Sequence, residues 1–117
     1  MKEQKRTKLT ELRLPSYRGE MLLLKYLELR RENPPTVENL PEDFDEFVDP
    51  VAAPPPRQPE RALRYLDDLI NMQYARVVEK PGVGRVVELT PIGGFSAEGI
   101  GLDSELRMQW EKQKERL

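Results

Sequence analysis

The sequence predicts a small α+β fold, and three observations within residues 57–94 lead to it. First, apolar residues recur at the three- and four-residue spacing of a buried helix face. They are Ala62, Leu63, Leu66, Leu69 and Ile70. Second, after Met72 the pattern becomes alternating, so that Val77 and Val78 face opposite sides of a strand. Third, Pro81–Gly84 supplies the positive φ angles that a hairpin turn needs. A helix that leads directly into a β-hairpin is therefore expected.

This stretch resembles the corresponding region of MarR-like and PadR-like transcriptional regulators. In those proteins a helix of the form LxxLxxxG leads into a strand, a charged hairpin and an LTxxG close. The matching residues are Leu63, Leu66, Leu69, Ile70, Val77, Val78, Arg85, Leu89, Thr90 and Gly93. The resemblance covers about a third of the chain. It implies a winged helix, in which one helix enters a DNA groove and the hairpin, or wing, touches the minor groove or the backbone.

The chain has 117 residues, enough for one small domain with appendages. We expect a basic N-terminal arm at 1–15, a winged-helix domain at 16–94 and a C-terminal helix at 95–117. No apolar run approaches the roughly 20 residues of a membrane span, and the first residues lack the apolar stretch of a secretory signal. A cytoplasmic protein without a membrane partner is the expectation.

Cysteine and histidine are both absent from the chain. Their absence removes disulfides, thiolate zinc sites, the commonest metal ligand and the commonest general base. Carboxylates alone could still hold Mg²⁺ or act as acid and base, but most acidic residues here read as solvated surface. We expect no catalytic residue, no metal site, no cofactor and no enzymatic activity.

The net charge of −2 is unusual for a nucleic-acid binder, but the two signs are segregated along the chain. Residues 1–33 hold nine Lys and Arg against five Asp and Glu, whereas residues 34–56 hold six acids and no base. The N-terminal cluster consists of Lys2, Lys5, Arg6 and Lys8. Such a cluster is either a solvated terminus or a phosphate contact.

The first helix is expected from Glu20 to Arg31, with Ser16 as its cap and Asn33–Pro35 as its stop. Its apolar residues are Met21, Leu23, Leu24, Tyr26, Leu27 and Leu29. Because they spread over more than a narrow stripe, this helix should be the most buried one.

Prolines are dense between residues 34 and 59, with eight in that stretch. Thr36–Leu40 resembles the start of the family's positioning helix, and Pro41 is expected to cut it short. Residues 41–57 are therefore expected to form a largely irregular, Pro-rich acidic insertion. Within it, Phe44, Phe47 and Val48 have the spacing to dock one helical turn on a core. The insertion is either a semi-rigid linker or a segment that contacts a partner or shields the basic face.

The helix from 59 to 72 carries the DNA hypothesis. Its expected outer face, opposite the core stripe, consists of Arg57, Arg61, Arg64, Tyr65 and Asp68. Arginines there can form forked hydrogen bonds to phosphates or guanine edges, and a tyrosine can donate to phosphate. Arg76, Lys80 and Arg85 flank the hairpin tip, where the resemblance implies contact with the minor groove or the backbone. The alternative is an ordinary solvated face and a charged edge strand.

The last helix is expected from about 103 to 117, after a flexible turn containing four glycines. Its stripe consists of Leu102, Leu106, Trp110 and Leu117, with Gln113 on the same side. A lone helix of this length is marginal in water, so the stripe must pack on something. It packs either on its own domain or, as the resemblance to PadR-like proteins favours, on a second copy in a homodimer.

Two functions follow from these observations. The first is a dimeric winged-helix transcriptional regulator that binds double-stranded DNA. The second is a winged-helix module that binds a protein partner through the acidic Pro-rich segment and the C-terminal helix. Fold alone does not decide between them.

Overall fold

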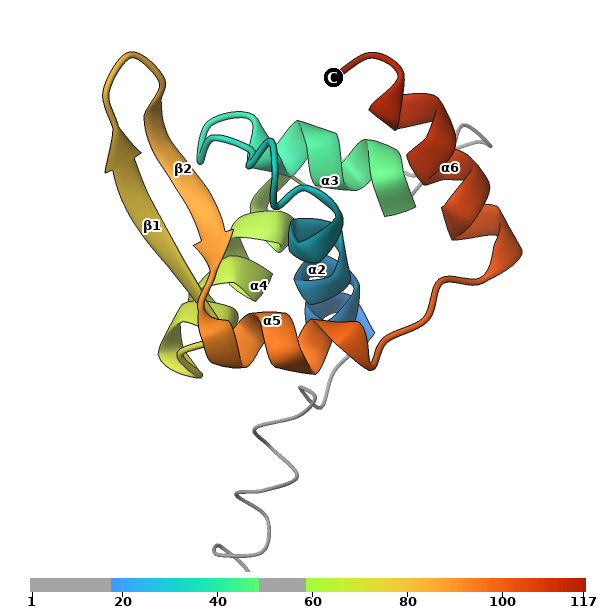
Figure 1. Ribbon diagram of the computed structural model, residues 1–117, viewed down its shortest axis with the longest axis horizontal. Helices are drawn as coiled ribbons and strands as arrows, with labels where there is room; N and C mark the ends of the chain where they lie inside the picture. Colours follow the sequence, from blue (N-terminus) through green and yellow to red (C-terminus); the bar gives the residue numbers. More distant parts are fainter. Residues whose placement is uncertain (1–17, 49–58) are drawn as a thin grey trace, which may run out of the picture.

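The computed structural model describes residues 18–48 and 59–117, and over these ranges the fold is α+β (Figure 1). Its elements are α2 (Arg18–Leu29), α3 (Leu40–Val48), α4 (Pro59–Asn71), β1 (Ala75–Lys80), β2 (Gly84–Leu89), α5 (Pro91–Glu98) and α6 (Ser104–Lys114). Several expected features lie outside the described residues: the basic arm at 1–15, the cap Ser16, and residues 49–57 of the insertion, which include Arg57.

Helix α2 lies at the centre of the fold, in contact with α3, α4, α5 and β2. Its fully buried apolar residues are Leu23, Leu24, Tyr26 and Leu27, each at most 2% exposed. Packing on several sides explains why the sequence shows a wide apolar face, and the expected burial of this helix is confirmed. The helix ends at Leu29 rather than Arg31. Arg30 lies in the turn that follows, where its Nε donates to the carbonyl of Asn33 at 2.9 Å.

The predicted hairpin is confirmed, with Val77 opposite Val87 and Val78 opposite Val86. Gly82 and Gly84 supply the positive φ angles of the turn, at 79° and 110°. These angles are costly for other residue types, which is why the Pro-Gly-Val-Gly pattern marks the turn in the sequence.

A third extended segment lies along the free edge of β2, between α2 and α3. Thr36 forms a bridge to Val86, and the N–H of Val87 donates to the carbonyl of Pro35 at 2.9 Å. The N–H of Val37 likewise donates to the carbonyl of Arg85 at 2.9 Å. Strand β2 is therefore flanked on both sides, by β1 and by this short segment.

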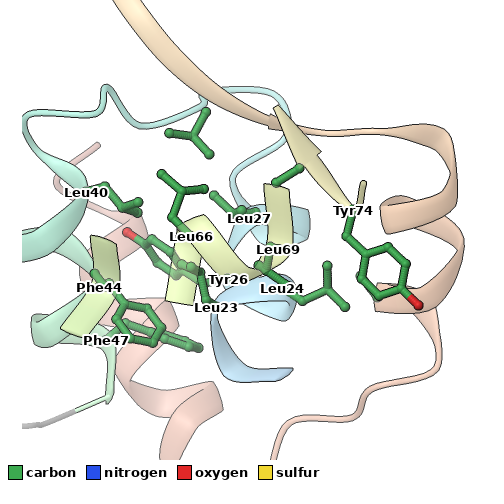
Figure 2. Packing of buried hydrophobic residues seen from close by; sticks show 14 of the residues in the cluster. Leu23, Leu24, Tyr26, Leu27, Leu40, Phe44, Phe47, Leu66, Leu69 and Tyr74 are labelled. Atoms are coloured by element: carbon green, nitrogen blue, oxygen red, sulfur yellow. The ribbon is translucent and has the colours of Figure 1, made fainter. Parts of the chain in front are cut away.

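The expectation that residues 41–57 are largely irregular is wrong for their first part, which belongs to α3. Pro41 does not cut a helix short; it stands in the first turn of α3, where a missing N–H costs nothing. Thr36 Oγ1 accepts the N–H of Asn39 at 3.1 Å and shapes the turn before this helix. Phe44 and Phe47 are fully buried, and the Phe47 ring lies 4.8 Å from that of Tyr26 between centroids. The predicted docking of these phenylalanines is confirmed (Figure 2).

Gly93 and Gly94 do not belong to the expected flexible turn, because Pro91–Glu98 is helix α5, whereas Gly99 and Gly101 do lie in the connection between α5 and α6. Thr90 caps it, since its Oγ1 accepts the N–H of Gly93 at 3.1 Å, and Pro91 occupies the first turn. Gly93 is buried against the backbone of Tyr74. The expected domain boundary at residues 94 and 95 therefore falls inside a helix.

Helix α6 packs against α3 of its own chain. Leu106 is buried, and Trp110 is half-buried with its ring edge-on to Tyr26, 6.2 Å between centroids. Gln113 is buried as well, accepting from Tyr26 Oη at 2.9 Å and donating to Glu46 Oε1 at 2.8 Å. The assignment of Leu106 and Trp110 to a dimer contact is therefore corrected: the stripe completes the chain's own core, together with the half-buried Leu102, and only Leu117 at its end is exposed.

Candidate nucleic-acid interface

Arg61, expected on the outer face of α4, instead joins α4 to α3. Its guanidinium donates to Asp45 Oδ1 at 2.9 Å, and Asp45 is only 2% exposed. The guanidinium carbon also lies 5.9 Å from the centre of the Phe44 ring. Because this ion pair compensates a buried carboxylate, Arg61 is a structural residue rather than a solvent-facing one.

Tyr65 is also turned inward, toward α2. A Cβ atom placed on Gly19 would come within 2.3 Å of the Tyr65 ring, so the ring lies directly on the backbone of α2. It is also edge-on to Phe44, 6.2 Å between centroids. Helix α4 packs on both α2 and α3, and its buried arc is therefore wider than one stripe. The expected core residues Leu63 and Ile70 instead lie at the solvent edge, 38% and 37% exposed.

The exposed face of α4 is not basic. Its exposed residues are Glu60, Leu63, Arg64, Asp67, Ile70 and Asn71. Within this set, Arg64 is the one positively charged residue, and Glu60 and Asp67 are both negatively charged. Of the helix residues proposed for DNA contact, Arg64 alone combines a described position with an exposed cationic side chain.

The hairpin carries three exposed cations beside the carboxylates of Glu79 and Glu88. The side chains of Arg76, Lys80 and Arg85 are 56%, 43% and 55% exposed, so the expected exposure of Lys80 and Arg85 is confirmed. Arg76 and Lys80 both pair with Glu88, at 3.4 and 3.1 Å, and together they lower the pKa of that carboxyl, Lys80 having the larger effect. Exposed pairs of this kind stabilise by only about 0–1 kcal/mol, so phosphates can replace the carboxylates at little cost.

Arg85, on the neighbouring strand, pairs with Glu38 at 3.4 Å. Both side chains are more than half exposed. This contact ties the hairpin to the turn before α3 only weakly, and it leaves the guanidinium accessible to an anion in solution.

A carboxyl pair, with Glu20 buried and Asp68 partly exposed, lies where α2 meets α4. Glu20 is 4% exposed and hydrogen-bonds the side chain of Asp68. Burial, then the hydrogen bond and the negative charge of Asp68, raise the pKa of Glu20 to about 7. No pattern in the sequence pointed to this pair, because a glutamate is ordinarily exposed.

Glu20→Gln is expected to stabilise the protein at alkaline pH. The folded chain holds the Glu20 proton more tightly than the unfolded chain, whose pKa is near the ordinary 4.5. The stability that the protonated Glu20 contributes is therefore fully present below pH 4.5 and is lost as the pH rises through 7. Glutamine, which cannot ionise, should raise the free energy of unfolding at pH 8 by up to ~3 kcal/mol.

Urea unfolding at pH 5 and pH 8 measures the effect of Glu20→Gln. Glu32→Gln, which changes an exposed carboxylate in the turn after the same helix, is the control and should leave both values unchanged. Equal destabilisation by Glu20→Gln at the two pH values would contradict the raised pKa.

No group of three or more His, Cys, Asp or Glu residues within 18–48 and 59–117 could hold a metal ion. None of the helices described over those ranges is long and apolar enough to cross a membrane. Comparisons with protein-family models, curated proteins and solved structures gave no match.

Proposed function

We propose that the chain is a winged-helix protein that binds double-stranded DNA through α4 and the β1–β2 hairpin. The observation that carries the proposal is the order of its elements: α2, the extended segment at Thr36, α3, α4, β1 and β2. A winged helix has this order, with a short first strand beside the hairpin and the recognition helix directly before it. Here the isolated bridge at Thr36 takes the place of that strand, and Figure 1 shows α4 leading into the β1–β2 hairpin.

The end of α4 supports the same arrangement. In the LxxLxxxG pattern, Leu66 and Leu69 are the leucines, and the glycine position falls on Gln73. Gln73 has a φ of 68°, a left-handed conformation that glycine adopts most easily. The chain thus has the left-handed backbone conformation that the pattern's glycine would adopt, but with glutamine in place of glycine.

In this proposal the hairpin provides affinity and α4 provides orientation. Arg76, Lys80 and Arg85 exchange their carboxylate partners for phosphates, which releases counterions from the DNA. Arg64 reaches a phosphate or a base edge from α4. Glu60 and Asp67 on the same helix face repel phosphates, so binding should be weak and strongly salt-dependent, with modest sequence preference.

DNA titration tests the proposal. Arg85→Ala should weaken binding to duplexes of any sequence and reduce the slope of log affinity against log salt by about one unit. Arg64→Ala should cost about 1–3 kcal/mol of binding free energy if the side chain contacts a base. Fluorescence anisotropy with a random and a selected duplex measures both effects.

Lys112→Ala, an exposed cation on α6, is the matched control and should leave binding unchanged. Arg61→Ala is not a suitable test, because it leaves the buried Asp45 without its partner and so perturbs the fold. Absence of any duplex binding at ~50 mM salt, where phosphate contacts are strong, would overturn the proposal.

A protein-binding module is the second candidate, and one observation favours it. Leu63 and Ile70 on α4 and Val77 on β1 are each 37–40% exposed, on the elements that the DNA proposal assigns to the interface. Apolar side chains suit a protein partner better than a phosphate backbone. Leu63→Lys should weaken the binding of a protein partner but should not weaken the binding of DNA. The variant therefore separates the two candidates.

A further inference from the structure

Helix α5 holds an aromatic side chain, Phe95, largely in solvent. Phe95 is 67% exposed on a helix that is fixed by the Thr90 cap and by the close packing of Gly93. The buried residues Gly93, Ser96 and Ala97 define the inner side of α5, and Phe95 lies on the opposite side. A large aromatic group held rigidly in water is a frequent anchor of protein interfaces.

A concave site reaches Gly94, the residue before Phe95, where the ends of α2 and β2 meet the start of α5. Its volume is about 310 Å³, and its lining is apolar at Pro34, Leu89, Pro91 and Gly94 but also includes the Arg76–Glu88 ion pair. A Cβ atom on Gly94 would meet nothing within 4 Å, so the glycine leaves this wall open. A cavity of about 150 Å³ is enough to hold a benzene ring. The site therefore has room for a phenylalanine side chain.

We propose that this face of α5 binds a second copy of the chain, with Phe95 of each copy in the concave site of the other. The protruding group and the site that fits it are adjacent on one helix, at Phe95 and Gly94. A two-fold axis brings such a self-complementary patch onto itself and uses both features twice. An unrelated partner would have to supply both a matching group and a matching site.

The charges around the site are also self-complementary. Arg31, on the rim, and Glu98, one helical turn beyond Gly94, are both exposed. Neither forms an ion pair with any residue in 18–48 or 59–117, whereas Glu28 on the same rim is held by Lys25 at 2.6 Å. When Phe95 of one copy enters the other, Glu98 of the first approaches Arg31 of the second. This pairing replaces the dimer contact that the sequence assigned to α6.

Sedimentation of the full chain without DNA tests the interface independently of the proposed function. At about 50 µM the protein should run largely as a dimer, since a dissociation constant of micromolar order leaves most of the chain paired at that concentration. Phe95→Asp should give a folded monomer, whereas Met108→Asp, at a side chain 56% exposed on α6, should remain a dimer. A monomeric parent chain, or a dimeric Phe95→Asp variant, overturns the proposal.

Charge reversal identifies the occupant as a second copy. Arg31→Glu and Glu98→Arg should each raise the dimer dissociation constant about tenfold, a loss of ~1.4 kcal/mol. The chain that carries both changes should recover most of the affinity, because each reversed charge then meets the other across the axis. Failure of the double variant to recover, when both single variants are folded by circular dichroism, would rule out the pairing.

Discussion

Leu66→Ala is expected to lower the free energy of unfolding by about 2–5 kcal/mol. Leu66 is 3% exposed, and Figure 2 shows it among Tyr26, Leu27 and Leu40, where α4 meets α2 and α3. Truncation removes apolar contact and leaves a cavity that well-packed neighbours fill only in part. Small domains are stable by only about 5–15 kcal/mol, so the variant should lose a large share of its stability.

Leu63→Ala on the same helix is the matched control for Leu66→Ala. Leu63 is 38% exposed, so its truncation leaves no closed cavity and should cost well under half as much. Urea unfolding of the two variants at one pH gives both values. A loss below ~1 kcal/mol for Leu66→Ala would mean that the side chain does not fill the core.

Gly93→Ala is expected to cost about 3 kcal/mol or more, at the upper end of overpacking effects. A Cβ atom at this position would lie 1.9 Å from the carbonyl oxygen of Tyr74, which is backbone and cannot swing aside. The same oxygen accepts the N–H of Thr90 at 3.1 Å, and Tyr74 is itself 1% exposed. Relief of the clash must therefore pull α5 away from the end of α4 and the start of β1.

Gly94→Ala, at the next residue, should have the opposite sign. Its Cβ would meet nothing within 4 Å, and alanine is favoured over glycine inside a helix by roughly 0.5–1 kcal/mol. Both variants are best compared by thermal unfolding in the Phe95→Asp background, where dimerisation through α5 does not contribute. Equal effects at the two positions would contradict the close contact of Gly93 with Tyr74.

The proposed dimer and the proposed DNA function can each hold without the other, but they meet at Arg76, which lines the concave site and is one of the three hairpin cations assigned to phosphates. A two-fold dimer through α5 presents two copies of α4 and of the hairpin, and binding of the first copy raises the local concentration of the second at the DNA. Phe95→Asp then weakens DNA binding without touching any proposed DNA contact, whereas Arg85→Ala leaves the dimer intact.

Local patterns were enough to predict the elements whose signals lie within a few neighbouring residues. The apolar periods of α2 and α4, the alternation of the hairpin and its glycine turn all follow from 3.6- and 2-residue repeats. The spacing of Phe44 and Phe47 likewise indicated a docked helical turn, although the proline density hid the full length of α3. A proline is neutral in the first turn of a helix and disruptive later, and composition alone does not distinguish these positions.

The sequence by itself determined the α+β class, the positions of α2, α4 and α6, and the register-setting turn of the hairpin. Only the tertiary structure decided that Arg61 pairs with Asp45, that Glu20 meets Asp68, and that Trp110 packs on Tyr26. These partners are far apart in the chain, so no periodicity records them. Which side of a helix is buried depends on how many neighbours pack around it, and that number is set by the assembled fold.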